Sequence, residues 1–251
     1  MRNVTAAAAA PDPAAVKPHS AAIAADSIRL LQEAVQRFGR VVYATSLGPE
    51  GAVLTDLIFA SVPQIDIFTV DTGRLPESTL ELLERIERRY GRRIRVVFPD
   101  AQRVQNYVAD HGINGFYNGL AQRQACCHIR KVEPFQRAIS GYNAWVSGVR
   151  REQSAARGAV QPLEWDGRYR LQKVNPLLEW TERDVWDYIR REKLPYNPLH
   201  DAGYPSIGCA PCTRAVQPGQ DSRAGRWWWE DPESRECGLQ PRQLPGSISD
   251  L

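Results

Sequence analysis

The sequence lacks the features of a membrane protein and of a secreted, disulfide-rich protein. No apolar run approaches the roughly 20 residues that a membrane-spanning helix needs. The N-terminus has one early arginine followed by alanines, without the leucine-rich core of a secretory signal. Its five cysteines are an odd number, unlike the even set of a disulfide framework. We therefore expect a cytoplasmic protein with reduced thiols and no membrane partner.

The chain also lacks a strong charge imbalance. A formal net charge of +3 over 251 residues is too weak to indicate a nucleic-acid-binding surface. It is compatible with an anionic small substrate held by a local group of cations. Hydrophobic content of 43% and charged content of 24% are ordinary, and the length suffices for one large α/β core.

The N-terminal segment lacks aromatic residues and is rich in alanine and proline. It buries too little apolar surface to offset the entropy of ordering, so we predict a disordered tail over residues 1–25. We assign residues 26–217 to one domain and residues 218–251 to a C-terminal segment of weak periodicity. The domain begins with a helix from an N-cap at Asp26 or Ser27 to Phe38.

Strands and helices alternate through the domain. Strands are predicted at residues 40–46, 64–70, 93–98, 143–147 and 170–174. This alternation predicts an α/β fold with a doubly wound, mostly parallel sheet. Ligands of such sheets bind outside the carboxyl ends of the strands, where the loops 46–51, 71–74 and 98–100 are expected. The first of these contains glycines and precedes a helix, which suits a phosphate, although an ordinary strand–helix turn has the same pattern.

Four of the five cysteines fall in two pairs, Cys126–Cys127 and Cys209-Ala-Pro-Cys212, about eighty residues apart. Four thiolates that converge in the fold indicate a metal centre, whereas separate buried cysteines are the plainer alternative. One tetrahedral zinc is an awkward fit, because adjacent cysteine side chains diverge. A 4Fe–4S cluster offers a separate iron to each thiolate, so the spacing favours the cluster over zinc.

The fifth cysteine, Cys237, lies near the C-terminus and is followed by a glycine. A flexible tail of this kind can carry a thiol nucleophile into a pocket, although an incidental cysteine is the alternative. Glu236 disfavours the thiolate, so its activation requires cations from elsewhere. Arginine suits phosphate and sulfate oxygens, and the chain offers four candidate cations near these motifs. They are Lys131, Arg157, Arg223 and Arg226.

Several motifs occur together over roughly residues 27–240. They are Thr45-Ser46-Leu-Gly-Pro-Glu50, Val70-Asp71-Thr-Gly-Arg-Leu-Pro-Glu77, Cys126-Cys127-His-Ile-Arg-Lys131, Ser147-Gly-Val-Arg-Arg-Glu-Gln-Ser-Ala-Ala-Arg157, Ile207-Gly-Cys209-Ala-Pro-Cys212-Thr-Arg, Gly225-Arg226-Trp-Trp-Trp-Glu230 and Glu236-Cys237-Gly-Leu. Together they resemble the assimilatory adenylyl-sulfate (APS) reductases of the APS/PAPS reductase family, and their joint occurrence is highly specific.

The resemblance implies an adenine-nucleotide α-hydrolase-like (Rossmann-like) fold with a flexible C-terminal tail. It implies reduction of APS to sulfite and AMP, with thioredoxin as the external reductant, and it allows a homo-oligomer. Within the family, the four cysteines mark enzymes that hold a 4Fe–4S cluster and prefer APS over the 3′-phosphorylated nucleotide, PAPS. Carried over residue by residue, Cys237 is the nucleophile, the cluster ligands are Cys126, Cys127, Cys209 and Cys212, and the substrate is held by Ser46, Gly48, Lys131, Arg157, Arg223 and Arg226.

Two positions depart from the family pattern. Gln240 stands where a histidine is usual, and Gly51 stands where an acidic residue is common. The tryptophans at 227–229 have two interpretations, a docking face for thioredoxin or a buried packing group.

Three rival functions remain at this stage. A PAPS reductase shares the reaction. An ATP pyrophosphatase that thiolates tRNA shares the expected fold, but its nucleotide loop reads S-x-G-x-D-S, and Glu50-Gly51 replaces its last two residues here. A non-enzymatic iron or redox sensor leaves Cys237 without a role.

Overall fold

The computed structural model describes residues 17–153, 157–231 and 234–235. Side chains are described from residue 21 onward. The predictions for Cys237 and Gln240 therefore lie outside the described residues.

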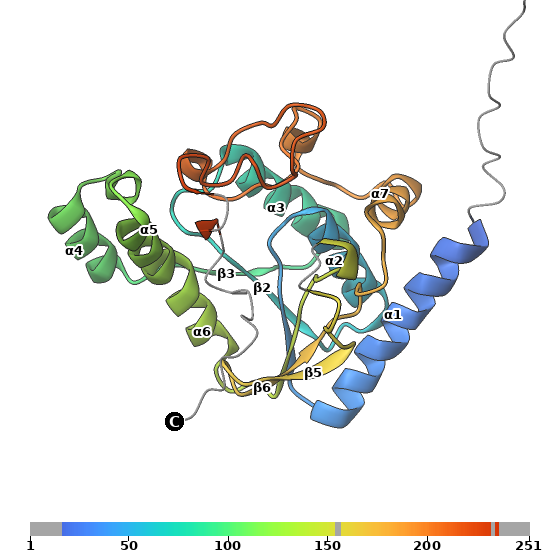
Figure 1. Cartoon of the computed structure of the whole chain (residues 1–251). Coiled ribbons are helices and arrows are strands. Elements are labelled where there is room, and N and C mark those ends of the chain that lie inside the picture. Colours follow the sequence, from blue (N-terminus) through green and yellow to red (C-terminus); the bar gives the residue numbers. More distant parts are fainter. Residues whose placement is uncertain (1–16, 154–156, 232–233, 236–251) are drawn as a thin grey trace, which may run out of the picture.

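A six-stranded sheet forms the centre of the molecule (Figure 1). Its strands are β1 (Val41–Ala44), β2 (Asp66–Val70), β3 (Arg95–Val97), β4 (Ala144–Val146), β5 (Leu163–Asp166) and β6 (Leu171–Val174), in the order β3-β2-β1-β4-β6-β5. All neighbouring pairs are parallel except β5 with β6. The predicted doubly wound, mostly parallel sheet is confirmed. The edge strand β5 was not predicted.

Helices cover both faces of this sheet. The α-helices are α1 (Lys17–Phe38), α2 (Pro49–Ser61), α3 (Glu77–Tyr90), α4 (Ala101–His111), α5 (Leu120–Cys127), α6 (Glu133–Ile139) and α7 (Glu182–Arg191). Shorter helical segments are η1 (Gly115–Tyr117), the π-helix η2 (His128–Val132), η3 (Arg151–Gln153), η5 (Pro198–His200) and η6 (Ala210–Cys212).

Strand β1 shows how the two faces arise from the sequence. Successive side chains of a strand point to opposite faces. Val41 and Tyr43 accordingly pack into the larger apolar cluster with α1, α2, α3 and α7. Val42 lies in a second cluster with Phe135 of α6. The strand is a continuous apolar run because both of its faces are buried.

Helix α1 begins at Lys17, nine or ten residues before the predicted N-cap. Residues 17–25, assigned from composition to a disordered tail, are therefore helical. Alanine has the highest helix propensity, and here the local preference is supported by packing, because Ala24 is buried in the larger cluster. The sequence also contains a helix-start pattern in which Thr181 is followed three residues later by Asp184, and in the structure these residues form a reciprocal capping box at the start of α7.

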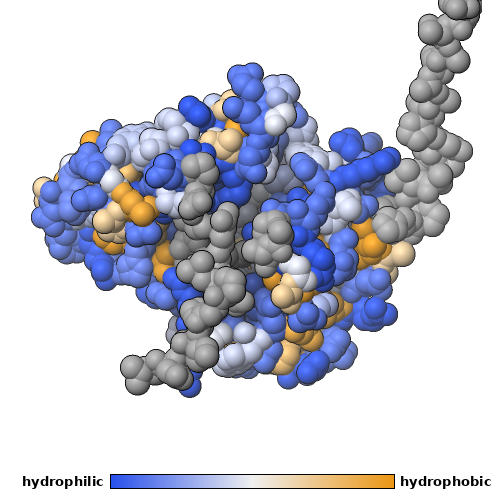
Figure 2. Space-filling model, in the orientation of Figure 1, coloured by the Kyte–Doolittle hydropathy of each residue, from blue (hydrophilic) through white to orange (hydrophobic). Residues whose placement is uncertain are grey.

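Helices α4 and α5 form a lobe that projects beside the sheet (Figure 1). Its core is a third apolar cluster, which contains Tyr107, Phe116, Trp227 and all four paired cysteines. In Figure 2 the lobe is mainly hydrophilic with small apolar patches, and Ile113, Tyr117 and Leu120 are its exposed large apolar side chains. Long-range packing thus brings residues from the C-terminal third of the chain against α4 and α5.

Candidate functional site

The four paired cysteines converge, as the sequence predicted. Cys126 and Cys127 end helix α5, and Cys209 and Cys212 flank the short turn η6. All four are free thiols within the third apolar cluster. The turn forms because Pro211 suits a first helical turn and the amide of Cys212 donates to the carbonyl of Cys209 at 2.9 Å.

The loop after β2 connects this cysteine group to the sheet. The Thr72 hydroxyl lies 3.2 Å from the Sγ of Cys209, and the carbonyl of Arg74 accepts a hydrogen bond from the amide of Ala210 at 2.8 Å. On the other side, Arg130 donates to the Thr72 carbonyl at 2.7 Å. The loop thus contacts both cysteine-bearing segments at the carboxyl edge of the sheet, where a ligand of this fold binds.

Arginines surround the cysteine group. Burial raises the pKa of the Cys126 thiol, and the charges of Arg130 and Arg74 oppose that rise. Burial and the neighbouring thiols also raise the pKa of Cys212, against the charge of Arg226. These two thiols are therefore partly desolvated, and arginine charges oppose the effect of burial at each of them.

The indole N–H groups of two tryptophans are relevant to which group the cysteines could bind. The Nε1 atoms of Trp227 and Trp229 are buried and have no hydrogen-bond partner among the described residues. Both rings belong to the cysteine cluster. Buried donors normally have an acceptor, so this pair fits a bound group with acceptor atoms such as inorganic sulfide.

Within the described residues, no three or more His, Cys, Asp or Glu side chains are grouped so that they would hold a metal ion. The metal-ligand assignment of the four cysteines stays a prediction.

The sequence left two interpretations of the tryptophans at 227–229, a docking face for thioredoxin or a buried packing group. Trp227 is 2% exposed and lies in the cluster, so the packing interpretation is right for this residue. Trp228 and Trp229 are half-buried and contact the ring of Tyr117.

Arg226 and Arg223 both lie over the ring of Trp227, at 4.8 and 6.0 Å from its centroid. Arg226 is 9% exposed, and its guanidinium lies against Gly208, where a β-carbon would be 2.1 Å from Nη2. Arg223 donates to the carbonyl of Arg235 at 3.3 Å. These two predicted substrate residues therefore lie beside the cysteine group, and Gly208 is required for the close approach of Arg226.

The predicted nucleotide loop joins β1 to α2. Gly48 is the N-cap of α2, and its helix start has no side-chain cap, so backbone N–H groups remain at this end. Ser46 is exposed, and Leu47 adopts a left-handed conformation with φ of 57°. Strands β1 and β4 are the point at which the strand order reverses, so this loop has the position expected of a ligand-binding loop.

Glu50 connects this loop to the segment after β4. Its Oε1 accepts from Nε of Arg150 and from Nε2 of Gln153, both at 2.9 Å. At the departure Gly51, a β-carbon would lie 2.9 Å from the Oγ1 of Thr45, so a residue with a side chain would require the Thr45 side chain to shift.

The remaining predicted substrate residues are Lys131 and Arg157. Lys131 is half-buried in the π-helix η2, four residues after Cys127, and its side chain forms no hydrogen bond or ion pair with the described part of the chain. π-Helices are frequent at functional sites because they re-aim side chains. Arg157 is half-buried, and its carbonyl accepts from the amide of Val160 at 3.2 Å.

Sequence reasoning missed three residues that contact the cysteine group. They are Thr72, Arg123 and Arg130. The arginines could have been predicted from their spacing, because residues three or four apart on a helix share a face. Arg123 precedes Cys126 by three residues and Cys127 by four. Thr72 had no such signal, since its contact spans 137 residues.

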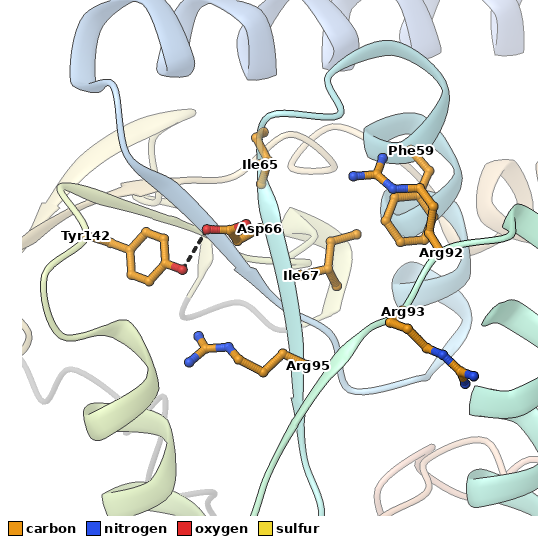
Figure 3. Close-up of a pocket in the computed structure, with 8 residues that line it drawn as sticks. All are labelled: Phe59, Ile65, Asp66, Ile67, Arg92, Arg93, Arg95 and Tyr142. Atoms are coloured by element: carbon orange, nitrogen blue, oxygen red, sulfur yellow. Dashed lines mark hydrogen bonds between the residues drawn. The ribbon is translucent and has the colours of Figure 1, made fainter.

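A separate pocket of about 340 Å³ lies at the opposite, amino edge of β2 and β3 (Figure 3). Its lining includes Asp66, which accepts a hydrogen bond from Tyr142, and three arginines. In Figure 3 the side chain of Arg93 points away from Arg92 and Arg95. The cysteine group and the nucleotide loop are on the other edge, so this pocket is not part of the candidate site.

Among the described helices, none combines the length and the hydropathy needed to span a bilayer.

Comparisons with known proteins agree with the geometry. The model of the phosphoadenosine phosphosulfate reductase domain matches residues 40–215. The chain is 52% identical over 220 residues to an adenosine 5'-phosphosulfate reductase of Allochromatium vinosum, a match that covers 88% of this chain and 86% of that protein.

Two solved structures are also similar. A phosphoadenylyl-sulfate reductase of Candida auris, in complex with phosphate, aligns with a TM-score of 0.65 and 26% identity over 80% of this chain and 97% of its own. An FMN adenylyltransferase of Candida glabrata aligns with a TM-score of 0.56 over 80% of this chain and 68% of its own. At 14% identity the second likeness concerns the fold alone.

Proposed function

The chain belongs to the family of adenosine 5'-phosphosulfate reductases, within the phosphoadenosine phosphosulfate reductase domain family, and we propose that it reduces adenylyl sulfate (APS) to sulfite and AMP with thioredoxin as electron donor. The observation that carries the proposal is the convergence of four cysteines and several arginines beside the segment that leads to Cys237. APS is an anion, and arginine side chains suit it.

In the first step, the Cys237 thiolate attacks the sulfur of the APS sulfate group. A bond forms between Sγ and that sulfur, and the bond from the sulfur to the bridging oxygen breaks. AMP leaves with the electron pair of that bond, and Cys237 carries an S-sulfonate. Fixed cations offset the oxyanion charge that builds on the transferred group and on AMP.

In the second step, a thiolate of reduced thioredoxin attacks the Sγ of Cys237. A disulfide forms between the two proteins, and sulfite leaves with the electron pair of the broken sulfur–sulfur bond. The second thiol of thioredoxin then attacks this disulfide and releases the Cys237 thiolate. The two electrons therefore come from the thioredoxin dithiol, which ends as a disulfide.

We assign a 4Fe–4S cluster to the four paired cysteines. Its support is the shared apolar environment of these thiols and the two unpartnered indole N–H groups of Trp227 and Trp229. Cys126, Cys127, Cys209 and Cys212 would be the ligands, one for each iron. When bound, the cluster supplies local charge beside the substrate site and holds the two cysteine-bearing segments together.

The substrate is assigned to two groups of residues at the carboxyl edge of the sheet. Ser46 and Gly48 would bind the nucleotide phosphate through the start of α2. Arg223 and Arg226, over the ring of Trp227, would bind the sulfate, with Lys131 and Arg157 completing the cationic set.

The test is sulfite release by anaerobically purified protein with reduced thioredoxin, with APS and PAPS in parallel. We expect strong turnover of APS and little turnover of PAPS. A preference for PAPS would support the reduction to sulfite but refute APS as the substrate. An absence of sulfite with both nucleotides would refute the proposed function.

A matched variant identifies the nucleophile. Cys237→Ser is expected to abolish sulfite release while the iron content of the protein stays unchanged. Retained turnover in this variant would show that another group attacks the sulfate.

A further inference from the structure

We propose that the buried ion pair of Arg123 and Glu230 is a positioning device for the nucleophile. It fixes Glu230 and Ser234, which precede Cys237 in the chain, relative to the helix that bears Cys126 and Cys127. The inference rests on the proposed function, because it takes Cys237 as the attacking group. Arg123 and Glu230 act through the segment and are positioning residues.

The contact is a bidentate pair between two buried side chains. The side chains of Arg123 and Glu230 are 2% and 6% exposed. Nε and Nη2 of Arg123 donate to the two carboxylate oxygens of Glu230 at 2.9 and 2.7 Å. Two parallel hydrogen bonds of this kind fix orientation as well as distance, because both groups are planar.

The same guanidinium has contacts on both sides of the pair. Its Nη2 also donates to the carbonyl of Ser234 at 2.8 Å, three residues before Cys237. On the other side it interacts with the side chain of Cys127, on its own helix. Its Cζ lies 4.6 Å from the ring centroid of Trp227. One side chain thus connects the cysteine helix to the last described residues of the chain.

Arg235 extends this arrangement to two residues before the nucleophile. Its Nη2 and Nε donate to the carbonyl of Glu230 at 2.7 and 2.9 Å, and its own carbonyl accepts from Arg223. Arg223 is also a predicted sulfate ligand. Ser234 and Arg235 are therefore held by one arginine from α5 and by one arginine of the candidate substrate site.

A purely stabilising role is a weaker explanation of this pair. Removing two charges from water costs free energy, and apolar residues of similar size often stabilise a core equally well. The arginine fork supplies a geometry that apolar residues lack, since it joins a carboxylate, a backbone carbonyl and a cysteine at fixed angles. In-line attack on sulfur depends on such placement of the nucleophile.

The test uses Arg123→Lys and Glu230→Gln in the full chain, with the exposed pair Arg88–Glu84 supplying the control variant Arg88→Lys. Arg123→Lys keeps the charge and loses the fork, whereas Glu230→Gln keeps the shape and loses the charge. Three quantities are measured. They are the rate of S-sulfonate formation on Cys237 with APS but without thioredoxin, the Kd for APS, and the rate of trypsin cleavage after Arg235.

We expect S-sulfonate formation to slow by at least about tenfold in both variants, because small misplacements of a nucleophile have effects of this size. The Kd for APS and the iron content are expected to stay within about twofold of the wild type, since substrate contacts are unchanged. Cleavage after Arg235 is expected to accelerate, because proteases attack segments that open locally. Arg88→Lys is expected to match the wild type in all three measurements.

Unchanged S-sulfonation and unchanged cleavage in both variants would overturn the inference. An equal loss of iron, APS affinity and S-sulfonation would also overturn it, by showing that the pair serves folding alone. If the wild-type protein itself forms no S-sulfonate on Cys237, the proposed function fails instead. The two failures are therefore distinguishable.

Discussion

At the scale of single residues, the site depends on close approaches that admit little extra volume. Gly208 is the clearest case, because the guanidinium of Arg226 occupies the space that a β-carbon would fill. Arg226 is itself held over Trp227, beside Cys212. A single methyl group at position 208 would therefore displace Arg226, a proposed substrate residue, and not the backbone.

We predict that Gly208→Ala raises the KM for APS. The nearest atoms are the far end of a flexible side chain, so Arg226 is displaced while the fold persists. The loss of one charge-assisted contact corresponds to roughly a tenfold rise in KM. Gly167→Ala is the control, since nothing lies within 4 Å of a β-carbon there. An unchanged KM in Gly208→Ala would argue against Arg226 as a substrate ligand.

Lys131 provides the second prediction at this scale. It is half-buried, lies four residues after Cys127, and has no partner among the described residues. Lys131→Ala is expected to lower kcat/KM for APS by about ten- to a hundredfold, the effect of one charged hydrogen bond, while the iron content is retained. The control is Arg183→Ala, an exposed residue of α7. A wild-type rate in Lys131→Ala would remove this residue from the substrate site.

At the scale of elements, one carboxylate joins three helices. Asp56 of α2 accepts hydrogen bonds from Tyr90 of α3 at 2.6 Å and from Tyr188 of α7 at 2.7 Å. Burial, and then the hydrogen bond to Asp56, raise the pKa of both tyrosines well above their usual value. The helices on one face of the sheet are thus joined by a polar contact as well as by the apolar cluster.

This contact predicts that the free energy of unfolding decreases at alkaline pH. In the folded protein the two tyrosines keep their protons above the pH, about 10, at which the unfolded chain loses them. The contribution of Tyr90 and Tyr188 is therefore full below about pH 10 and is lost as the pH rises toward the folded pKa values. Urea denaturation from neutral to alkaline pH should show this decline, with a shallower slope in Tyr188→Phe. Equal slopes in the two proteins would contradict the assignment.

At the scale of the whole molecule, helix α1 connects the start of the domain to the segment between β6 and α7. The Ser27 hydroxyl of α1 donates to the carbonyl of Pro176 at 2.7 Å, across 149 residues. The same oxygen accepts from the indole of Trp180 at 3.0 Å. Ser27 is 1% exposed, so water does not replace these bonds.

Ser27→Ala is expected to lower the free energy of unfolding by about 1–3 kcal/mol, because it leaves a buried carbonyl and a buried indole N–H unsatisfied. Urea denaturation followed by tryptophan fluorescence measures this loss. Ser140→Ala, at an exposed position, is the matched control and is expected to stay within about 0.5 kcal/mol of the wild type. A loss in Ser27→Ala no larger than in the control would refute this account.

Whether a feature could be predicted from the sequence depends on how local its pattern is. The parallel strands, the carboxyl-edge loops and the capping box at Thr181 have local patterns, and the structure confirms them. The convergence of the cysteines followed from their chemistry. Strand β5 was missed because it has only four residues, and its apolar–polar alternation is too short to separate a strand from a loop. The Arg123–Glu230 pair spans 107 residues, and no local pattern indicates a contact of that range.

The third apolar cluster has a consequence for how the protein is made. Its first cysteines, Cys126 and Cys127, precede Cys212 by about 85 residues and are followed still later by Trp227. At typical ribosomal elongation rates this interval lasts roughly 4 to 17 s. During that time two vicinal thiols have left the peptidyl transferase centre without the residues that will bury them. Oxidative damage to Cys126 and Cys127 should therefore fall mainly on nascent chains, because burial in the cluster shields these two thiols in the folded protein.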